Sequence, residues 1–268
     1  LMIKKIPNYV KYILYCIGFL LVYLFIFRLL FFLFVANFDS ASQKNIITAF
    51  IYGFRFDLKL SILSYFPLAI LILSTNYLFF KKKIFRVVAI TYHIINYLFL
   101  TIFYLIDIGY YSYLFTRLDA TALRFLSNLK ISSQLLIESY PVYKSILALI
   151  ILLLIIRYLS TKQFDKTALK DMPYISKKIK AFYFIIIFLL LSFGVYGSIT
   201  HYPLRWSEAF FSKNNTINQF ALNPVLNFFD SFSLRNDGAD IEKTKAYFPV
   251  IAKYLNLQRD TLLFERKI

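Results

Sequence analysis

The sequence predicts an all-α membrane protein with five transmembrane helices, its N-terminus inside the cell and its C-terminus outside. Three observations support this fold class. The chain is 59% hydrophobic over 268 residues, whereas soluble domains are about 45–50% apolar. Five apolar runs are long enough to cross the roughly 30 Å hydrocarbon core of a bilayer as helices. Basic residues gather in the segments on one side of these runs, as the positive-inside rule requires.

The five apolar runs are each predicted to be a helix, because a helix satisfies its own backbone groups in lipid and no alternating strand pattern occurs. The first run, Tyr12–Ala36, is too long for a signal peptide and no cleavage site follows it, so we expect a retained anchor. The fourth run is the shortest, and Lys144 and Arg157 can extend it by snorkelling. The later runs are Leu60–Phe80, Val87–Ile106, Val142–Leu159 and Ala181–Ile199.

The distribution of Lys and Arg orients the spans. With the N-terminus inside, the inner segments hold fourteen basic residues, and the two longer outer loops hold seven. The net charge of +17 is therefore mostly a topology signal, together with attraction to anionic lipid of the inner leaflet. This interpretation argues against nucleic acid as a partner.

The segments outside the spans carry amphipathic and aromatic patterns. Residues 37–59 have apolar side chains at helical spacing, and we expect an interfacial helix there that leads into the second span. Residues 107–126 begin with a cluster of tyrosines and are expected to lie on the outer face of the bilayer. Residues 1–200 are thus predicted to be the transmembrane domain and residues 201–268 an extracytoplasmic linker. Within this linker we expect a helix over 240–257, kinked at Pro249, and a strand-like start after Asp260.

Four residues of the outer segments are candidate contacts for a lipid headgroup. Arg117 presents a fork that fits a phosphate, and Asp119 could fix its orientation. The alternatives are a local surface salt bridge, or Asp119 as the cap of a helix that starts at Ala120. Arg205 and Trp206 could bind a headgroup, or could brace the tail against the bilayer, where Trp is common.

Two residues inside the predicted spans, Arg28 and His93, are candidates for a polar role within the membrane. A charged Arg such as Arg28 costs at least about 2.5–3.5 kcal/mol in the membrane. It therefore needs a lipid phosphate or an interhelix partner, for which Asp57 and Asp107 are available, unless it snorkels outward. His93 is expected to form interhelix hydrogen bonds rather than to relay protons.

The segment DIGYYSYLFTRLDATAL follows the third span, and HYPLRWSEAFFSKN and NQFALNPVLNFFDS follow the fifth. These segments resemble the N-terminal part of the lipoteichoic acid synthase-like family, membrane-anchored relatives of the sulfatases in the alkaline phosphatase superfamily. The resemblance covers nearly the whole chain, and residues 117–119 and 203–206 are its most specific parts.

The resemblance implies a bacterial cytoplasmic membrane protein in which five helices and a linker precede an extracytoplasmic α/β domain. That domain holds a divalent metal, usually manganese, and a Thr or Ser nucleophile. It transfers phosphoglycerol or related groups from lipid donors, or hydrolyses sulfate or phosphate esters. The implied partners of the present chain are anionic or phosphoglycerol lipid headgroups and, within the protein, the catalytic domain itself.

The residues of this chain do not form a catalytic motif of their own. The two histidines, His93 and His201, have no metal-ligand spacing around them, and no glycine-rich phosphate loop occurs. We therefore expect no catalytic residue, metal or other cofactor in these 268 residues. Two further hypotheses are a stand-alone protein that binds or moves a lipid or small anion, which needs polar groups converging within the membrane, and an assembly module that recruits a separate catalytic subunit.

Overall fold

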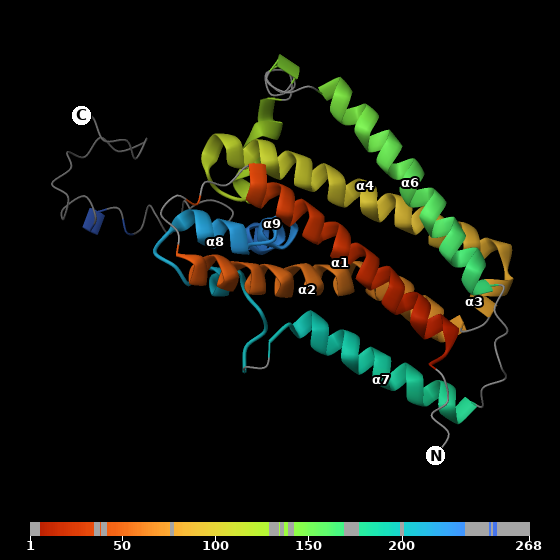
Figure 1. Ribbon diagram of the computed structural model, residues 1–268. Helices are drawn as coiled ribbons and strands as arrows, with labels where there is room; N and C mark the ends of the chain where they lie inside the picture. The colour runs from red at the N-terminus through yellow and green to blue at the C-terminus, as the bar shows by residue number, and fades with distance from the viewer. Residues whose placement is uncertain are drawn as a thin grey trace. The chain divides into compact units, whose positions relative to one another are not determined.

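The structure is a computed structural model that describes residues 6–34, 38, 42–75, 78–128, 134, 137–138, 142–168, 177–198, 201–233, 247 and 249–250 (Figure 1). Every regular element among these residues is a helix, and no strand occurs there. The chain divides into a large compact unit, residues 1–231, and a second unit, residues 232–268, in which only five residues are described. The helix and the strand-like start predicted after residue 239 fall almost entirely outside the described residues.

Five helices of the large unit are long and apolar enough to cross a membrane, which confirms the predicted number of spans. Their lengths range from 20 to 33 residues. Five shorter helices for which both bounds are described connect or follow them. The long helices are α1 (Asn8–Phe34), α2 (Gln43–Thr75), α4 (Lys83–Leu114), α6 (Val142–Ala168) and α7 (Lys177–Tyr196), and the short ones are α3 (Leu78–Lys81), η1 (Ala120–Asn128), η2 (Trp206–Ala209), α8 (Asn215–Ala221) and α9 (Pro224–Ser233).

Helices α1, α2 and α4 form the centre of the bundle, with α6 beside α4 and α7 beside α2 (Figure 1). The buried side chains of α6 are confined to its second half, from Ile156 to Thr167. Its first half exposes Ile and Leu side chains, which is the expected composition of a surface in contact with lipid tails. The protein core therefore lies between the first three long helices.

All five helices differ from the predicted spans in at least one boundary; α6, predicted to be the shortest span, has 27 residues, and α7 is the shortest with 20. Two of these differences affect the site described below. The second span starts at Gln43, because the helix expected at the interface continues without a break into α2. The third span ends at Leu114, so Asp107 belongs to the helix and is fully buried rather than lying on the outer face. The chain reverses only at Phe115, which has a left-handed backbone conformation with φ of 56°. A span predicted from hydropathy ends at the first charged residue, which here is Asp107. In the structure the Asp107 carboxylate is buried and paired, so the helix continues past it.

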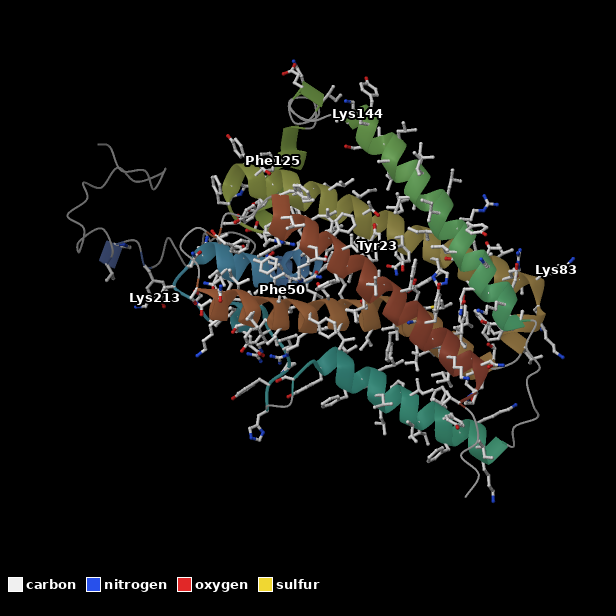
Figure 2. All side chains as sticks on the ribbon, viewed as in Figure 1. Tyr23, Phe50, Lys83, Phe125, Lys144 and Lys213 are labelled. Carbon is white, nitrogen blue, oxygen red and sulfur yellow. The ribbon has the colours of Figure 1, made fainter. Side chains whose placement is uncertain are left out.

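The segment after the fifth span packs against the bundle. The predicted transmembrane domain ends at residue 200, but the compact unit extends to Ser231. Helix α8 contacts α2 and α1, and η2 contacts α2 and α8. A second hydrophobic cluster forms at this end of the bundle, where the Phe220 ring of α8 lies 4.8 Å from that of Phe50 in α2 (Figure 2). Residues 201–231 are therefore part of the helical unit.

The predicted orientation in the membrane can be tested at Lys83 and Lys213, two exposed residues toward opposite ends of the bundle (Figure 2). We expect a membrane-impermeant maleimide to label Lys213→Cys in intact spheroplasts, and to label Lys83→Cys only after the membrane is permeabilised. The native Cys16 is buried, so the unsubstituted chain serves as the blank. Labelling of both variants in intact spheroplasts would contradict the orientation.

Candidate functional site

Four buried charged side chains meet where α8 and α9 join the bundle. Arg28 comes from α1, Asp57 from α2, Asp107 from α4, and Arg117 from the turn after α4, and none is more than 4% exposed. Each helical member continues the buried face of its helix, as Arg28 does between Leu24 and Phe31. The two positive and two negative charges balance, and we call these four residues the charge cluster. A balanced set is required because an unpaired buried charge costs several kcal/mol.

Arg28 is the most completely bonded member of the charge cluster. Its Nε lies 2.8 Å from Asp57 Oδ2 and its Nη2 lies 2.8 Å from Asp57 Oδ1, a bidentate ion pair. Its Nη1 donates to the carbonyl oxygen of Phe220, and its Nη2 also reaches the carbonyl oxygens of Gly53 at 3.1 Å and Leu222 at 3.4 Å. One guanidinium therefore joins α1, α2 and the C-terminal end of α8.

Gly53 makes room for this guanidinium. A Cβ atom built on Gly53 would overlap the Arg28 side chain, and the glycine carbonyl accepts a hydrogen bond from it. Gly53 lies within a regular helix, so glycine is not needed here for an unusual backbone conformation. It is needed because the guanidinium approaches the backbone closely. Any larger side chain at this position would displace Arg28 from Asp57.

Asn223 connects the chain after the fifth span to the charge cluster. Its Nδ2 donates to Asp57 Oδ1 at 2.8 Å and to the Tyr104 hydroxyl at 2.9 Å, and its side chain is fully buried. Its Oδ1 accepts hydrogen bonds from the backbone N–H groups of Val225 and Leu226, at 3.0 and 3.2 Å. Asn223 thus caps the start of α9 and at the same time bonds to α2 and α4. Pro224 directly after it is the residue favoured at the first helical position.

The second ion pair of the charge cluster is less completely bonded. Arg117 Nη2 lies 3.0 Å from Asp107 Oδ2, and the guanidinium stacks 4.2 Å from the centre of the Phe31 ring. The direction of approach is not that of a hydrogen bond, and Asp107 Oδ2 and Arg117 Nε have no hydrogen-bond partner in the described part of the chain. The other carboxylate oxygen, Asp107 Oδ1, accepts from the Leu118 N–H at 2.8 Å and so fixes the turn.

Three side chains of α8 and α9 hold the turn that carries Arg117. Gln219 Oε1 accepts from the Arg117 N–H at 2.8 Å, and Asn227 Nδ2 donates to the Leu118 carbonyl oxygen at 3.0 Å. Ser231 Oγ accepts from the Ala120 N–H at 2.9 Å. Together with Asn223, these bonds make the attachment of residues 201–231 polar as well as hydrophobic.

Two basic residues of α2 hold the segment between α7 and α8. Arg55 donates to the Gly197 carbonyl oxygen at 3.0 Å and pairs with Glu208 at 3.3 Å. Lys59 Nζ donates to the Leu204 carbonyl oxygen at 2.8 Å.

In α9, burial raises the pKa of the half-buried Asp230 carboxyl, and the nearby Lys59 ammonium opposes this shift.

The six residues singled out from the sequence lie in different surroundings. Arg28 and Arg117 share the charge cluster, and of the two carboxylates offered for Arg28 it pairs with Asp57. Asp119 Oδ1 accepts from the N–H of Thr121 at 2.8 Å at the start of η1, the capping role considered as an alternative. Arg205 and Trp206 are exposed, and the Arg205 guanidinium lies 5.4 Å from the centre of the Tyr202 ring. Lipid binding by Arg117, Asp119, Arg205 and Trp206 stays a prediction.

His93 lies in the other hydrophobic core of the bundle, apart from the charge cluster. Its Nδ1 lies 2.7 Å from the Tyr65 hydroxyl, and its Nε2 lies 3.2 Å from the Tyr12 hydroxyl. The imidazole thus links α4 to α2 and α1. Among the described residues, no three His, Cys, Asp or Glu side chains are grouped so that they could hold a metal ion.

No family model, curated protein or solved structure matches this chain. The resemblance to the lipoteichoic acid synthase-like family therefore stays a hypothesis, and the charge cluster is interpreted from its own geometry.

The two arginines of the charge cluster should respond differently to lysine. Arg28→Lys removes the bidentate pair and several carbonyl contacts, and we expect a loss of about 3 kcal/mol of stability. Arg117→Lys can keep its single contact with Asp107, and we expect a loss of about 1 kcal/mol. Thermal unfolding in detergent can be followed by the reaction of a maleimide dye with Cys16, which becomes exposed on unfolding. Equal losses in the two variants would contradict this interpretation.

A pair of glycines provides a second test. Gly53→Ala should lower the unfolding midpoint strongly, because the new methyl group would displace Arg28. Gly18→Ala in α1 meets no atom within 4 Å, so it should be neutral or stabilising by up to about 1 kcal/mol through helix propensity. The same dye assay measures both. An unaffected Gly53→Ala variant would show that Arg28 has room to move.

Proposed function

We propose that this chain is the membrane anchor of a sulfatase-like phosphotransferase or ester hydrolase that acts at the outer face of the bacterial cytoplasmic membrane. Its task is to hold the chain after the fifth span against the bundle, so that a catalytic domain that follows it stays next to the lipid substrate. The observation that supports this best is Asn223, which is fully buried and bonded to Asp57 and Tyr104 of two different spans.

The anchor attaches the segment at several points rather than through a flexible tether. Arg55 and Lys59 hold its start, the Arg28–Asp57 pair holds the α8–α9 connection, and Gln219 holds the turn after α4. A short, rigid attachment keeps the effective concentration of a tethered enzyme at the membrane high, whereas a long flexible linker dilutes it. It also limits the orientations in which the enzyme meets a lipid headgroup.

Two exposed residues are the candidates for contact with that headgroup. Arg205 directly precedes η2 and Trp206 is its first residue. The neighbouring Leu204 is buried and donates its N–H to the Tyr196 carbonyl oxygen at the end of α7. A basic side chain beside an exposed indole suits the boundary between lipid and water. Arg117 and Asp119 are committed to contacts within the protein, so we assign the headgroup contact to η2.

A second candidate function is binding or movement of a lipid or small anion by this chain alone. The charge cluster favours it, because buried charges within transmembrane helices often mark a pathway. Against it, each positive charge of this cluster faces a negative charge from a neighbouring element at 2.8 or 3.0 Å. An anion would have to displace one of these carboxylates.

The anchor function can be tested in the protein expressed from the whole reading frame that contains this chain. In vesicles with fluorescent phosphatidylglycerol and Mn²⁺, we expect Asn223→Ala to lower turnover of the lipid about tenfold. Turnover of a soluble phosphate or sulfate ester should stay unchanged, because only the position of the catalytic domain is affected. Lys213→Ala, at an exposed position just before α8, is the control and should leave both activities unchanged.

Two outcomes would contradict the proposal. Equal loss of lipid and soluble turnover in Asn223→Ala would mean that the residue does not act through positioning. Transport of labelled lipid by the 268-residue chain in liposomes, with no esterase or transferase activity from the whole reading frame, would support the second function instead.

A further inference from the structure

A small polar cavity lies in the hydrophobic core between α1, α2, α4 and α6. Its volume is about 10 Å³, and its polar lining includes Tyr12, Cys16, Tyr65, His93, Tyr97 and Ser160. His93 lies ten positions after Lys83, the first residue of α4, which corresponds to about 15 Å of helix. The cavity therefore lies within the bundle, toward the Lys83 end of α4 and apart from the charge cluster.

One hydroxyl group at this cavity lacks a partner. Tyr97 has no exposed surface, and its hydroxyl makes no hydrogen bond in the described part of the chain. The neighbouring Tyr65 hydroxyl is engaged with His93 Nδ1 at 2.7 Å. A buried hydroxyl without a partner costs about 1–3 kcal/mol, so a ligand that bonds to it would be stabilised.

Each ring nitrogen of the imidazole beside this cavity has one phenol hydroxyl as its partner, and these hydroxyls can form further hydrogen bonds. His93 Nε2 lies 3.2 Å from the Tyr12 hydroxyl, a long contact, and 3.9 Å from Cys16 Sγ. A neutral imidazole has one donor and one acceptor nitrogen, and a phenol can both donate and accept. The groups around the cavity therefore have capacity for one more hydrogen-bonding molecule.

We propose that this cavity binds one water molecule, which bonds to the Tyr97 hydroxyl and joins it to the group formed by Tyr12, His93 and Tyr65. A cavity of this volume has room for one water, and two to four polar partners are what a buried water needs. The lining contains no carboxylate, so it is poorly suited to a hard cation such as Na⁺ or Mg²⁺. The water links the α4 face of the bundle to α1 and α2.

The chain offers a direct test, because it contains two histidines. In a His201→Gln variant labelled with ¹⁵N-histidine and embedded in lipid bilayers, the imidazole signals come from His93 alone. We expect water-edited solid-state NMR to transfer magnetisation from a slowly exchanging water to the His93 ring. Tyr97→Phe should abolish the transfer, because the water loses the hydroxyl that holds it.

Tyr9 provides the matched control. Its hydroxyl is also buried without a hydrogen-bond partner in the described part of the chain, but Tyr9 does not line the cavity. Tyr9→Phe should therefore keep the transfer to His93 and leave the unfolding midpoint unchanged or raised, whereas Tyr97→Phe should lower the midpoint. The proposal would be overturned if no magnetisation passed from water to His93 in the protein that keeps Tyr97. It would also be overturned if the transfer persisted in Tyr97→Phe.

Discussion

Arg28 sets the constraint on which this structure depends. A guanidinium inside a membrane helix is stable only if its donors meet acceptors, because water is absent and an isolated charge is costly. Asp57 accepts from its Nε and Nη2 at 2.8 Å, the Phe220 carbonyl accepts from its Nη1, and the carbonyl groups of Gly53 and Leu222 also accept from Nη2. One of these carbonyl groups comes from α2, and two come from the chain after the fifth span. The charge in α1 thus specifies where residues far along the sequence must lie.

The two ion pairs of the charge cluster have different roles in this arrangement. The Arg28–Asp57 pair joins α1 to α2. It also bonds to the end of α8 and to Asn223, which caps α9. The Arg117–Asp107 pair is more local, since it links the turn after α4 to the helix that it follows. The Leu118 N–H bond to Asp107 and the Phe31 ring under Arg117 stabilise that turn. Helices α8 and α9 thus contact the Arg28–Asp57 pair directly and also bond to the turn that the Arg117–Asp107 pair stabilises.

The five spans could be predicted from the sequence, because long apolar runs are visible in its composition without any knowledge of contacts. It also identified Arg28 as a residue in need of a partner, since a charge inside an apolar run is conspicuous. It did not identify Asn223, because an Asn before a Pro predicts a helix start and carries no sign of a bond to Asp57. The same limit explains why residues 107–114 were expected on the surface. Whether a charge ends a span depends on a partner, and for Asp107 that partner is ten residues away.

The double role of Asn223 has a consequence for biogenesis. Its acceptors, Asp57 and Tyr104, lie on spans made long before it, and its own helix cannot dock until those spans stand side by side. Insertion of individual helices by the translocon therefore does not finish this protein. Until the last segment arrives, Arg28 lacks two of its carbonyl acceptors. Maturation ends with an assembly step in which a late segment completes the polar contacts of the earliest helix.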